Sequence, residues 1–256
     1  SLQPSVFALS HQGPYREVFA GYNLLNEDFL CSTLLSDLSQ ETPSLRRLFR
    51  WIIRSVFRLL RIAGIPSFSL FFYNARRSIE RRNFDVVIAF QEGTATAFTA
   101  ALQVDTKIAW IHSDYGNYLK QAGSQPEEKL YQNFRHIVCV SEFTAGVFKL
   151  VIPSQAPKVS SIPNIMAQDS IRSQAQLPVT NDRFKPEGAT LLCVGRLDPV
   201  KQFTAIPALA AAIKSKGIRF RWFLIGGGPA TERNAILTAI EKYEVSDVVV
   251  LLGETN

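Results

Sequence analysis

The sequence predicts a doubly wound α/β protein built from two domains. Three observations lead to this prediction. Short apolar runs rich in β-branched residues recur along the 256-residue chain, most of them are continuous rather than alternating, and segments with helical spacing lie between them. Continuous apolar runs are typical of parallel strands with both faces covered, and their alternation with helices is typical of a doubly wound sheet.

The expected strands and helices follow these runs in order. The strands comprise residues 6–9, 29–35, 85–90, 107–113, 136–141, 158–164, 190–196, 221–227 and 248–253. One late helix begins near Lys201, and a second has Pro229 in its first turn. Their apolar stripes comprise Ile206, Leu209, Ala210 and Ile213 in the first and Ile236, Ala239, Ile240 and Tyr243 in the second.

A polar segment divides the predicted fold. Residues 164–188 contain two prolines and several turn residues, which favours a linker between a first α/β domain at 1–163 and a second at 189–256. The second domain then contains only β-α-β-α-β, which is half of a doubly wound sheet. Because the chain opens on Ser1 rather than Met and stops directly after a strand-like run, we expect a fragment.

The composition is that of a globular protein without membrane spans. The net charge of +6 suggests an anionic partner but does not distinguish a nucleotide from nucleic acid or a membrane. No run of about 18 residues is free of charge, and no signal-peptide pattern opens the chain. Cys31, Cys139 and Cys193 lie far apart in apolar runs, so we expect reduced core cysteines in a cytosolic protein and no zinc site.

A basic helix is predicted at 44–63. Its arginines are Arg46, Arg47, Arg50, Arg54, Arg58 and Arg61. Bulky apolar residues cover the rest of the helix, and it contains no acidic residue. This pattern fits an anionic membrane surface, and it fits equally well a surface helix that solvates its arginines. DNA binding is a third interpretation, which we disfavour because no nucleic-acid motif accompanies the charge.

Two cations stand at the end of a predicted buried strand. Arg196 and Lys201 follow the apolar run at 190–194, and ligands in open α/β sheets bind beyond the carboxyl ends of the strands. An arginine can hold phosphate oxygens with two hydrogen bonds, and a lysine adds a mobile charge. The pair therefore predicts a diphosphate site, with a pair of solvated loop cations as the alternative.

Two further strand ends carry candidate ligand-binding groups. Gly226, Gly227 and Gly228 lie between a strand and a helix, where the lack of side chains lets the backbone approach a ligand. Thr231 stands where a dinucleotide fingerprint requires a third small residue, which argues against a dehydrogenase. His112 ends another apolar run and precedes a polar loop, so we expect it to face a cleft.

Together these motifs resemble a known family. "VGRLDPVKQF", "FLIGGGP" and "VVVLLGETN" are similar to the donor half of family 4 glycosyltransferases of the GT-B fold. "FDVVIAFQEGTAT", "KIAWIHSDY" and "FRHIVCVSEFT" resemble bacterial members that build surface polysaccharides and glycolipids. The resemblance runs from about Asn83 to Asn256. It implies two Rossmann-like domains, of which the first lacks its opening strand and the second is only half present.

The resemblance implies retaining transfer of a hexose from a nucleotide diphosphate sugar to a polysaccharide or lipid-linked acceptor in cell-envelope glycan synthesis. No metal would be obligatory, since Arg196 and Lys201 would hold the diphosphate and stabilise the departing nucleotide. His112 would hydrogen-bond the transferred sugar. The loop of Gly226, Gly227 and Gly228, together with Gly253, would approach the nucleoside.

The acceptor side of the site is implied by residues of the first domain. Glu92, Asp114 and Tyr115 would lie there, with a helix-capping role as an equal alternative for Glu92. We expect the protein in the cytoplasm, with a peripheral position on the inner face of the cell membrane as a variant of this expectation.

The sequence departs from the family at three places. Gln202 follows Lys201 where the family usually has glycine. The opening strand and glycine-rich loop of the family have no counterpart before Val6, and its E-x7-E segment, which grips the donor sugar, is expected beyond Asn256. We therefore expect the fragment itself to be inactive. The alternatives are a non-catalytic protein that binds nucleotide sugars and a GT-B sugar-nucleotide epimerase.

Overall fold

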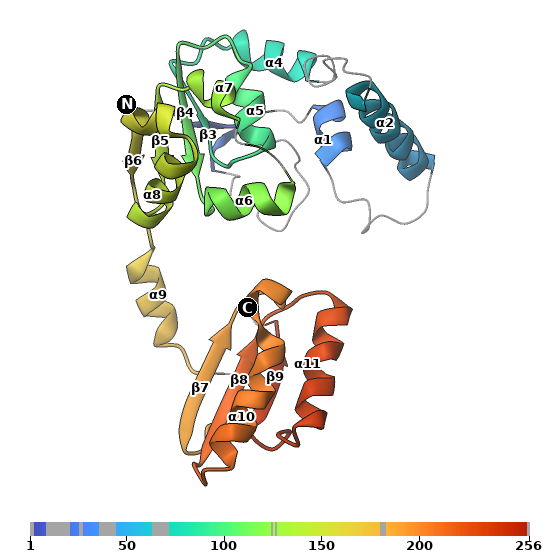
Figure 1. Cartoon of the computed structure of the whole chain (residues 1–256), viewed down its shortest axis with the longest axis vertical. Helices are drawn as coiled ribbons and strands as arrows, with labels where there is room; N and C mark the ends of the chain where they lie inside the picture. Colours follow the sequence, from blue (N-terminus) through green and yellow to red (C-terminus); the bar gives the residue numbers. More distant parts are fainter. Residues whose placement is uncertain are drawn as a thin grey trace. The chain divides into compact units, whose positions relative to one another are not determined.

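The fold was analysed in a computed structural model, in which the chain forms two compact units, Ser1–Met166 and Ala167–Asn256 (Figure 1). The described residues are 3–8, 21–25, 28–35, 45–62, 72–123, 125, 127–179 and 183–254. Within these ranges no helix is both long enough and apolar enough to span a lipid bilayer. Each unit contains its own parallel sheet and its own core, so the two are described separately.

Unit 1 is built on a parallel four-stranded sheet in the order β3-β4-β5-β6. Its strands are β3 (Val86–Ala89), β4 (Thr106–Ile111), β5 (His136–Cys139) and β6 (Val159–Ser161). The helices between and beside them are α4 (Tyr73–Glu80), α5 (Thr94–Ala100), α6 (Tyr115–Ala122), α7 (Glu128–Gln132) and α8 (Glu142–Val151), with a 3₁₀ segment at Pro153–Lys158. Three of these strands lie within the runs that the sequence predicts, and β4 begins one residue before its predicted run.

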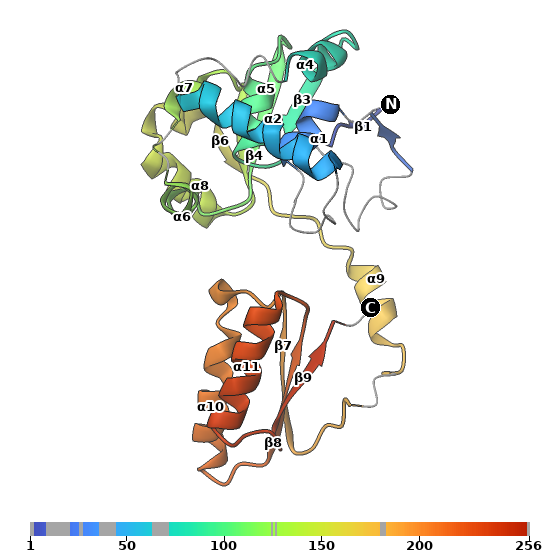
Figure 2. The same cartoon turned by 90° about the vertical axis from the view of Figure 1, so that its right-hand side faces the viewer.

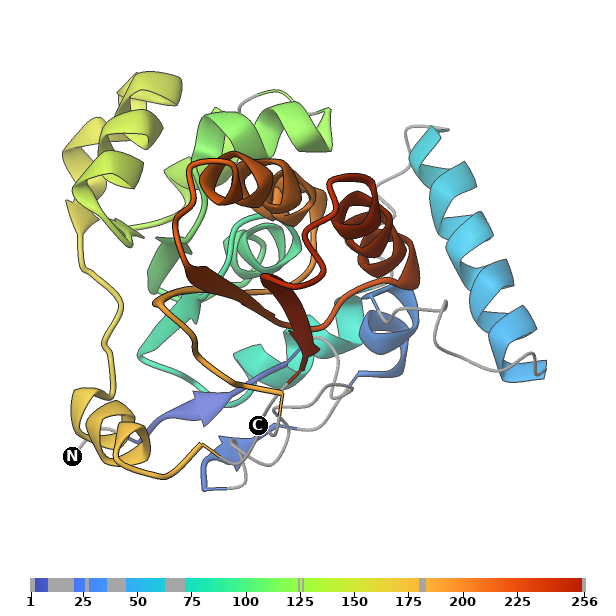
Figure 3. The ribbon, with the colours of Figure 1, turned by 90° about the horizontal axis from the view of Figure 1, so that it is seen from below.

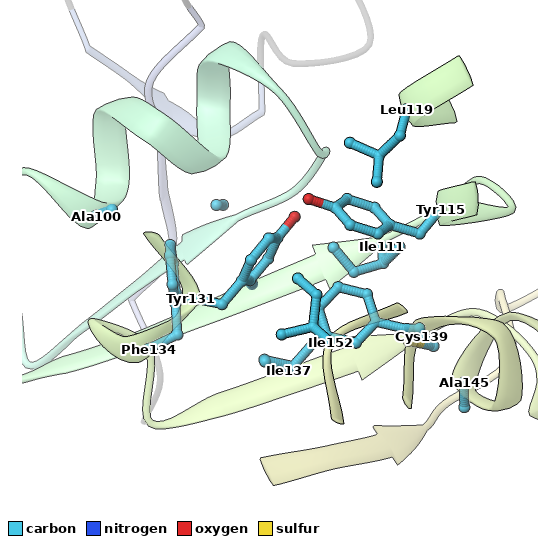
Figure 4. Close-up of a cluster of buried hydrophobic side chains, with 13 residues drawn as sticks. Ala100, Ile111, Tyr115, Leu119, Tyr131, Phe134, Ile137, Cys139, Ala145 and Ile152 are labelled. Atoms are coloured by element: carbon cyan, nitrogen blue, oxygen red, sulfur yellow. The ribbon is translucent and has the colours of Figure 1, made fainter. Parts of the chain in front are cut away.

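The larger of two buried clusters in the described part of unit 1 is rich in aromatic residues and lies between the sheet and α6, α7 and α8. Figure 4 shows Tyr115 and Tyr131 with their hydroxyl groups pointing toward each other, close to Ile111 and Ile152. Phe148 closes the cluster, since its ring lies 5.0 Å from that of Tyr115 and 4.9 Å from that of Tyr131. This packing fixes the carboxyl ends of β4 and β5, from which the candidate site extends.

The first part of unit 1 contains two short strands and two helices. The strands β1 (Ser5–Val6) and β2 (Asn23–Leu24) pair in parallel. The basic helix is confirmed as α2 (Leu45–Ile62). The strand predicted at 29–35 is wrong, because α1 (Phe29–Leu35) is a helix whose amino end is capped by the Asp28 carboxylate, 2.9 Å from Cys31 N. Of the strand predicted at 6–9, only Val6 belongs to β1, and residue 9 and the following turn lie outside the described residues.

Unit 2 contains the predicted β-α-β-α-β arrangement. Its parallel sheet has the order β7-β8-β9, with strands β7 (Ala189–Val194), β8 (Phe220–Ile225) and β9 (Val249–Gly253). The helices α10 (Ile206–Lys214) and α11 (Ala230–Lys242) cover the same face of this sheet (Figure 2). On the other face Leu192 and Val194 remain 54% and 68% exposed. One layer of helices thus packs on the sheet within the described chain.

The structure adds a helix to the predicted linker and corrects the start of the first helix of unit 2. The segment predicted as a linker contains a helix, α9 (Gln168–Ala175), which buries none of its residues. The helix expected from Lys201 begins instead at Ile206, because two 3₁₀ turns, Pro199–Lys201 and Phe203–Ala205, precede it. Pro229 directly precedes α11 as its N-cap residue.

The cysteines are free thiols in apolar surroundings. Cys31 and Cys139 are buried, and Cys193 is partly buried and accepts a hydrogen bond from Trp222 Nε1 at 3.4 Å. Burial raises the pKa of the Cys139 thiol to about 11, so this side chain stays protonated near neutral pH. The prediction of core cysteines is confirmed for Cys31 and Cys139.

Candidate functional site

The two predicted cations lie in one loop at the carboxyl end of β7. The Arg196 side chain is 76% exposed, and its Nη2 atom pairs with Asp198 Oδ2 at 3.1 Å. The other oxygen of Asp198 accepts a hydrogen bond from Val200 N at 3.1 Å. Asp198 thus caps the 3₁₀ turn and also orients the guanidinium group, while Leu197 is buried and anchors the loop. The exposed end of Arg196 is accessible to an anion from solvent.

Lys201 ends the 3₁₀ turn that Asp198 begins. Its backbone N–H donates to Asp198 O at 2.8 Å, and its side chain is exposed. The next residue, Gln202, adopts the left-handed conformation with φ 53°, which glycine adopts at little cost. Gln202 is the single residue between the two 3₁₀ turns. Its left-handed backbone conformation explains why glycine is usual at this position in the family that the motif resembles.

We predict that Gln202→Gly stabilises unit 2 by about 1 kcal/mol, because the strain of a side chain in the left-handed region exceeds the added flexibility of the unfolded chain. Urea unfolding followed by circular dichroism measures the change. Val200→Gly, in the neighbouring turn, is the matched control and should lower the free energy of unfolding by about 0.5–1 kcal/mol. Equal effects of the two variants would contradict the conformational assignment of Gln202.

The glycine loop packs tightly against the arginine loop. A Cβ atom on Gly226 would lie 1.8 Å from Gly195 O, and one on Gly228 would lie 2.4 Å from Leu197 O. Backbone hydrogen bonds connect the same loops, from Gly195 N to Ile225 O (2.9 Å) and from Leu197 N to Gly227 O (2.8 Å). These contacts give two of the predicted donor-binding glycines a structural role, since they hold the chain that carries Arg196 in place.

Gly227 and the end of β9 lie at the same edge of the sheet as the arginine loop. A Cβ atom on Gly227 would lie 2.7 Å from Glu254 Oε2, and Gly226 N donates to Gly253 O at 2.9 Å. Gly253 itself has φ 86° with open space around its Cα. The three strand ends of unit 2 therefore meet in one hydrogen-bonded surface, beside which α11 begins without a side-chain cap. Such an uncapped amino terminus favours a bound anion.

The corresponding edge of unit 1 carries His112 and Glu92. Glu92 is 7% exposed, and its Oε2 accepts a hydrogen bond from His112 N at 3.0 Å, so the loop after β3 holds the end of β4. The His112 ring packs edge-on against Phe90 at 4.8 Å. Its Nε2 atom is buried and has no hydrogen-bond partner within the described ranges. An unpaired imidazole nitrogen is costly unless a ligand supplies the partner.

The structure gives Asp114 and Glu92 roles other than direct acceptor contact. The Asp114 carboxylate is the N-cap of α6, since it accepts from Asn117 N at 2.9 Å and from Asn117 Nδ2 at 3.0 Å. Glu92 caps no helix, because Gly93 is the N-cap residue of α5 and the carboxylate of Glu92 reaches across to the next strand. The helix-capping alternative considered for Glu92 is thus wrong.

The placement of Tyr115 on the acceptor side is also wrong. Its side chain is 1% exposed and belongs to the aromatic core, because the cap at Asp114 starts a helix that turns the next residue toward the sheet. Burial raises the pKa of the Tyr115 phenol, so it remains protonated at neutral pH. Tyr115 stabilises unit 1 and does not face a substrate.

Sequence reasoning also missed residues that support the site. Asp198 orients Arg196, and the signal for it was present, since an Asp before a Pro is typical of the start of a helical turn. Tyr118 was missed as well. Its hydroxyl fills the space beside Gly93, so that a Cβ atom there would lie 2.7 Å from it, and this contact depends on tertiary packing. Within the described residues no group of three or more His, Cys, Asp and Glu side chains is placed to hold a metal ion.

The family is decided by comparison with known protein families. Residues 28–166 match the model of glycosyltransferase family 4. The chain belongs to this family. The match spans almost all of unit 1, whereas Arg196, Lys201 and the glycine loop of this glycosyltransferase chain lie beyond it in unit 2.

Three solved structures are similar to this family 4 chain, and the first of them shares its fold. A glycosyltransferase from Rickettsia africae aligns with 99% of the chain and 60% of its own length, at 12% identity and a TM-score of 0.51. HepE (Alr3699) from Anabaena, determined in complex with UDP and glucose, aligns with 77% of the chain and 58% of its own length, at 17% identity and a TM-score of 0.49. The lipopolysaccharide outer core galactosyltransferase WaaB aligns with 74% and 49%, at 16% identity and a TM-score of 0.46.

The predicted α/β class and GT-B architecture of this family 4 chain are confirmed. The chain spans about three-fifths or less of the length of these three structures. No curated protein sequence matches it. That the first domain lacks a strand and the second is half present stays a prediction.

Proposed function

We propose that the full-length protein transfers a hexose, with retention of anomeric configuration, from a nucleotide diphosphate sugar to a glycan or lipid-linked acceptor. The observation that supports this most strongly is the loop at the end of β7, where Arg196 and Lys201 stand beside the glycine loop in a member of a glycosyltransferase family. HepE, which shares the general fold, was solved with UDP and glucose bound.

The proposed chemistry places the two cations at the leaving group. When the bond between the sugar and the diphosphate breaks, negative charge accumulates on the diphosphate. The guanidinium of Arg196 and the ammonium of Lys201 would stabilise that charge, and the amino terminus of α11 would add backbone N–H donors. In the unliganded chain Asp198 occupies one side of the guanidinium, at 3.1 Å, which leaves its remaining donors for phosphate oxygens.

The proposed role of unit 1 is to contact the transferred sugar and the acceptor. His112 Nε2 would gain its missing hydrogen bond from a sugar hydroxyl or a phosphate oxygen, and Glu92 would act as a positioning residue through its bond to His112 N. The cell-envelope acceptor and the cytoplasmic location belong to the same proposal. They are supported by the resemblance of the unit 1 motifs to enzymes of surface glycan synthesis.

We expect His112→Ala in the full-length protein to lower the transfer rate by about 10- to 30-fold, the value of one or two neutral hydrogen bonds. Donor affinity should change less, since the diphosphate contacts lie in unit 2. His136→Ala is the matched control, because His136 is an exposed histidine at the opposite, amino end of the neighbouring strand β5. A rate loss that is equal in both variants would contradict a specific role of His112.

The test of the proposed function is a transfer assay with labelled nucleotide sugars. The full-length protein is incubated with UDP-, GDP- and ADP-hexoses and with lipid extracts from the source cells, and NMR spectroscopy gives the anomeric configuration of the product. We expect one donor to yield a product with the configuration of the donor. Donor binding without any transfer would support the non-catalytic alternative, and interconversion of the nucleotide sugar would support the epimerase.

A further inference from the structure

Helix α2 carries an apolar stripe that the described residues of unit 1 leave largely exposed. Its members are Leu45, Leu48, Phe49, Ile52, Val56 and Leu59, which are between 42% and 86% exposed. At about 100° per residue these six positions fall within an arc of about 100°, so they form one continuous face of the helix. Trp51, 61% exposed, lies at the margin of this face. An apolar face of this length on a surface helix indicates a contact with another phase or molecule.

The side of α2 opposite the stripe is basic, and one of its arginines contacts α1. The arginine positions 46, 47, 50, 54, 58 and 61 all lie on this half of the helix. Arg54 Nε donates to Thr33 O of α1 at 2.9 Å, which fixes the direction of the helix relative to α1. Ile53, Phe57 and Leu60 are partly buried beside it. Figures 1 and 3 both show α2 beside α1 at the margin of unit 1.

The apolar surface extends from α2 onto α1. Phe29, at the start of α1, is 57% exposed, and its ring stacks with that of Phe49 at 6.4 Å. The stripe and Phe29 together are named the α2 apolar face here. Arg54 is directed toward α1 and away from this face.

The charge of α2 identifies what fits this face. The helix contains six arginines and no acidic residue. A second copy of the chain that docked by the same face would offer the arginines of α2 no acidic partner on its own α2, so it would complement the apolar stripe alone. An anionic lipid surface has both complements, since acyl chains receive the apolar stripe and lipid phosphates lie at the level of the flanking guanidinium groups.

We infer that α2 lies in the plane of an anionic membrane surface, with the α2 apolar face inserted among the lipid chains and arginines such as the exposed Arg58 at the headgroups. Membrane binding by α2 does not depend on the proposed function. Only its biological role, which is to bring the enzyme to a lipid-linked acceptor, rests on that function. The helix docks on the bilayer without crossing it, because six arginines are distributed along its length.

Vesicle flotation of the full-length protein tests this inference. Vesicles of phosphatidylcholine alone are compared with vesicles of phosphatidylcholine and phosphatidylglycerol in a two-to-one ratio. We expect binding to the anionic vesicles that weakens at high salt, and the double variant Leu48→Gln/Leu59→Gln should lower it by at least about 30-fold. Both leucines are exposed, so the variant should retain the circular dichroism spectrum and melting temperature of the parent.

A matched control removes exposed leucines elsewhere. Leu150 on α8 and Leu209 on α10 are 81% and 55% exposed, comparable with Leu48 and Leu59, and Leu150→Gln/Leu209→Gln should leave vesicle binding unchanged. Arg58→Gln should weaken binding to anionic vesicles and leave any binding to neutral vesicles unchanged. The vesicles contain neither donor nor acceptor, so this result is independent of whether the proposed transfer reaction is found.

Three results would overturn the inference. Vesicle binding that the stripe variant leaves intact would place the membrane contact elsewhere. A protein that binds no vesicles but changes from an oligomer to a monomer in the stripe variant, as measured by light scattering, would make the face an interface between copies. If the protein binds no vesicles and the stripe variant does not change its oligomeric state, the face contacts neither a membrane nor a second copy of the chain.

Discussion

Arg196→Ala is expected to lower the transfer rate of the full-length protein by about 30- to 1,000-fold, with a matching loss of donor affinity. This range corresponds to about 2–4 kcal/mol, the usual value of a charge-assisted contact to a group that gains negative charge in the transition state. The Arg196 side chain is 76% exposed, so its removal should leave the stability of unit 2 nearly unchanged. Rates and donor affinities are measured with the nucleotide sugar that the transfer assay identifies.

The control for this variant removes the same charge from the other end of the sheet. Arg219 precedes β8, is 80% exposed and pairs with Glu187 at 2.7 Å, far along the strands from the β7 loop. Arg219→Ala should leave transfer unchanged. If both variants lost activity equally, the effect would reflect the net charge of the unit, and the assignment of Arg196 to the diphosphate would fail.

Gly226→Ala is expected to lower the free energy of unfolding of unit 2 by about 3 kcal/mol or more. The added methyl group would lie 1.8 Å from Gly195 O, and the residue has φ 152°, which L residues rarely adopt. Steric overlap and backbone strain each cost about 1–3 kcal/mol when the surroundings are backbone and cannot move aside. Urea unfolding measures the change, and activity should fall together with it because the same contact holds the Arg196 loop.

The matched control separates steric overlap from conformation. Gly217 also has a positive φ, 70°, but a Cβ atom there meets nothing within 4 Å. Gly217→Ala should therefore cost only about 1–2 kcal/mol, the conformational part. A stable, active Gly226→Ala protein would contradict the close packing of the two loops and return the glycine to the purely ligand-facing role that the sequence suggested.

The strands of the four-stranded and the three-stranded sheet could be predicted because their signal is local. Continuous apolar runs such as those of β4, β5 and β8 are too short for helices and end in glycine or polar residues, so their type and order were evident. The same reasoning failed at 29–35, where an apolar run of strand length is a helix. The deciding signal there was a single residue, Asp28, whose carboxylate caps the first turn.

The candidate site was predictable in position but not in detail. Placement of Arg196, Lys201 and His112 at strand ends follows from the alternation of runs and loops. The direction of Tyr115 into the core does not, because it depends on the helix that Asp114 caps and on the partners Tyr131 and Phe148 far along the chain. The roles of Gly226 and Gly228 likewise depend on the β7 loop that lies against them.

The most direct test of the central proposal is the preference of the full-length protein for nucleoside diphosphates over the corresponding monophosphates. Isothermal titration with uridine, guanosine and adenosine nucleotides gives this preference without knowledge of the sugar or the acceptor. We predict that one diphosphate binds at least about tenfold more tightly than its monophosphate, and that Arg196→Ala abolishes the difference while Arg219→Ala retains it. Equal affinities for the two nucleotides, or a preference that survives in Arg196→Ala, would contradict a diphosphate site at the end of β7.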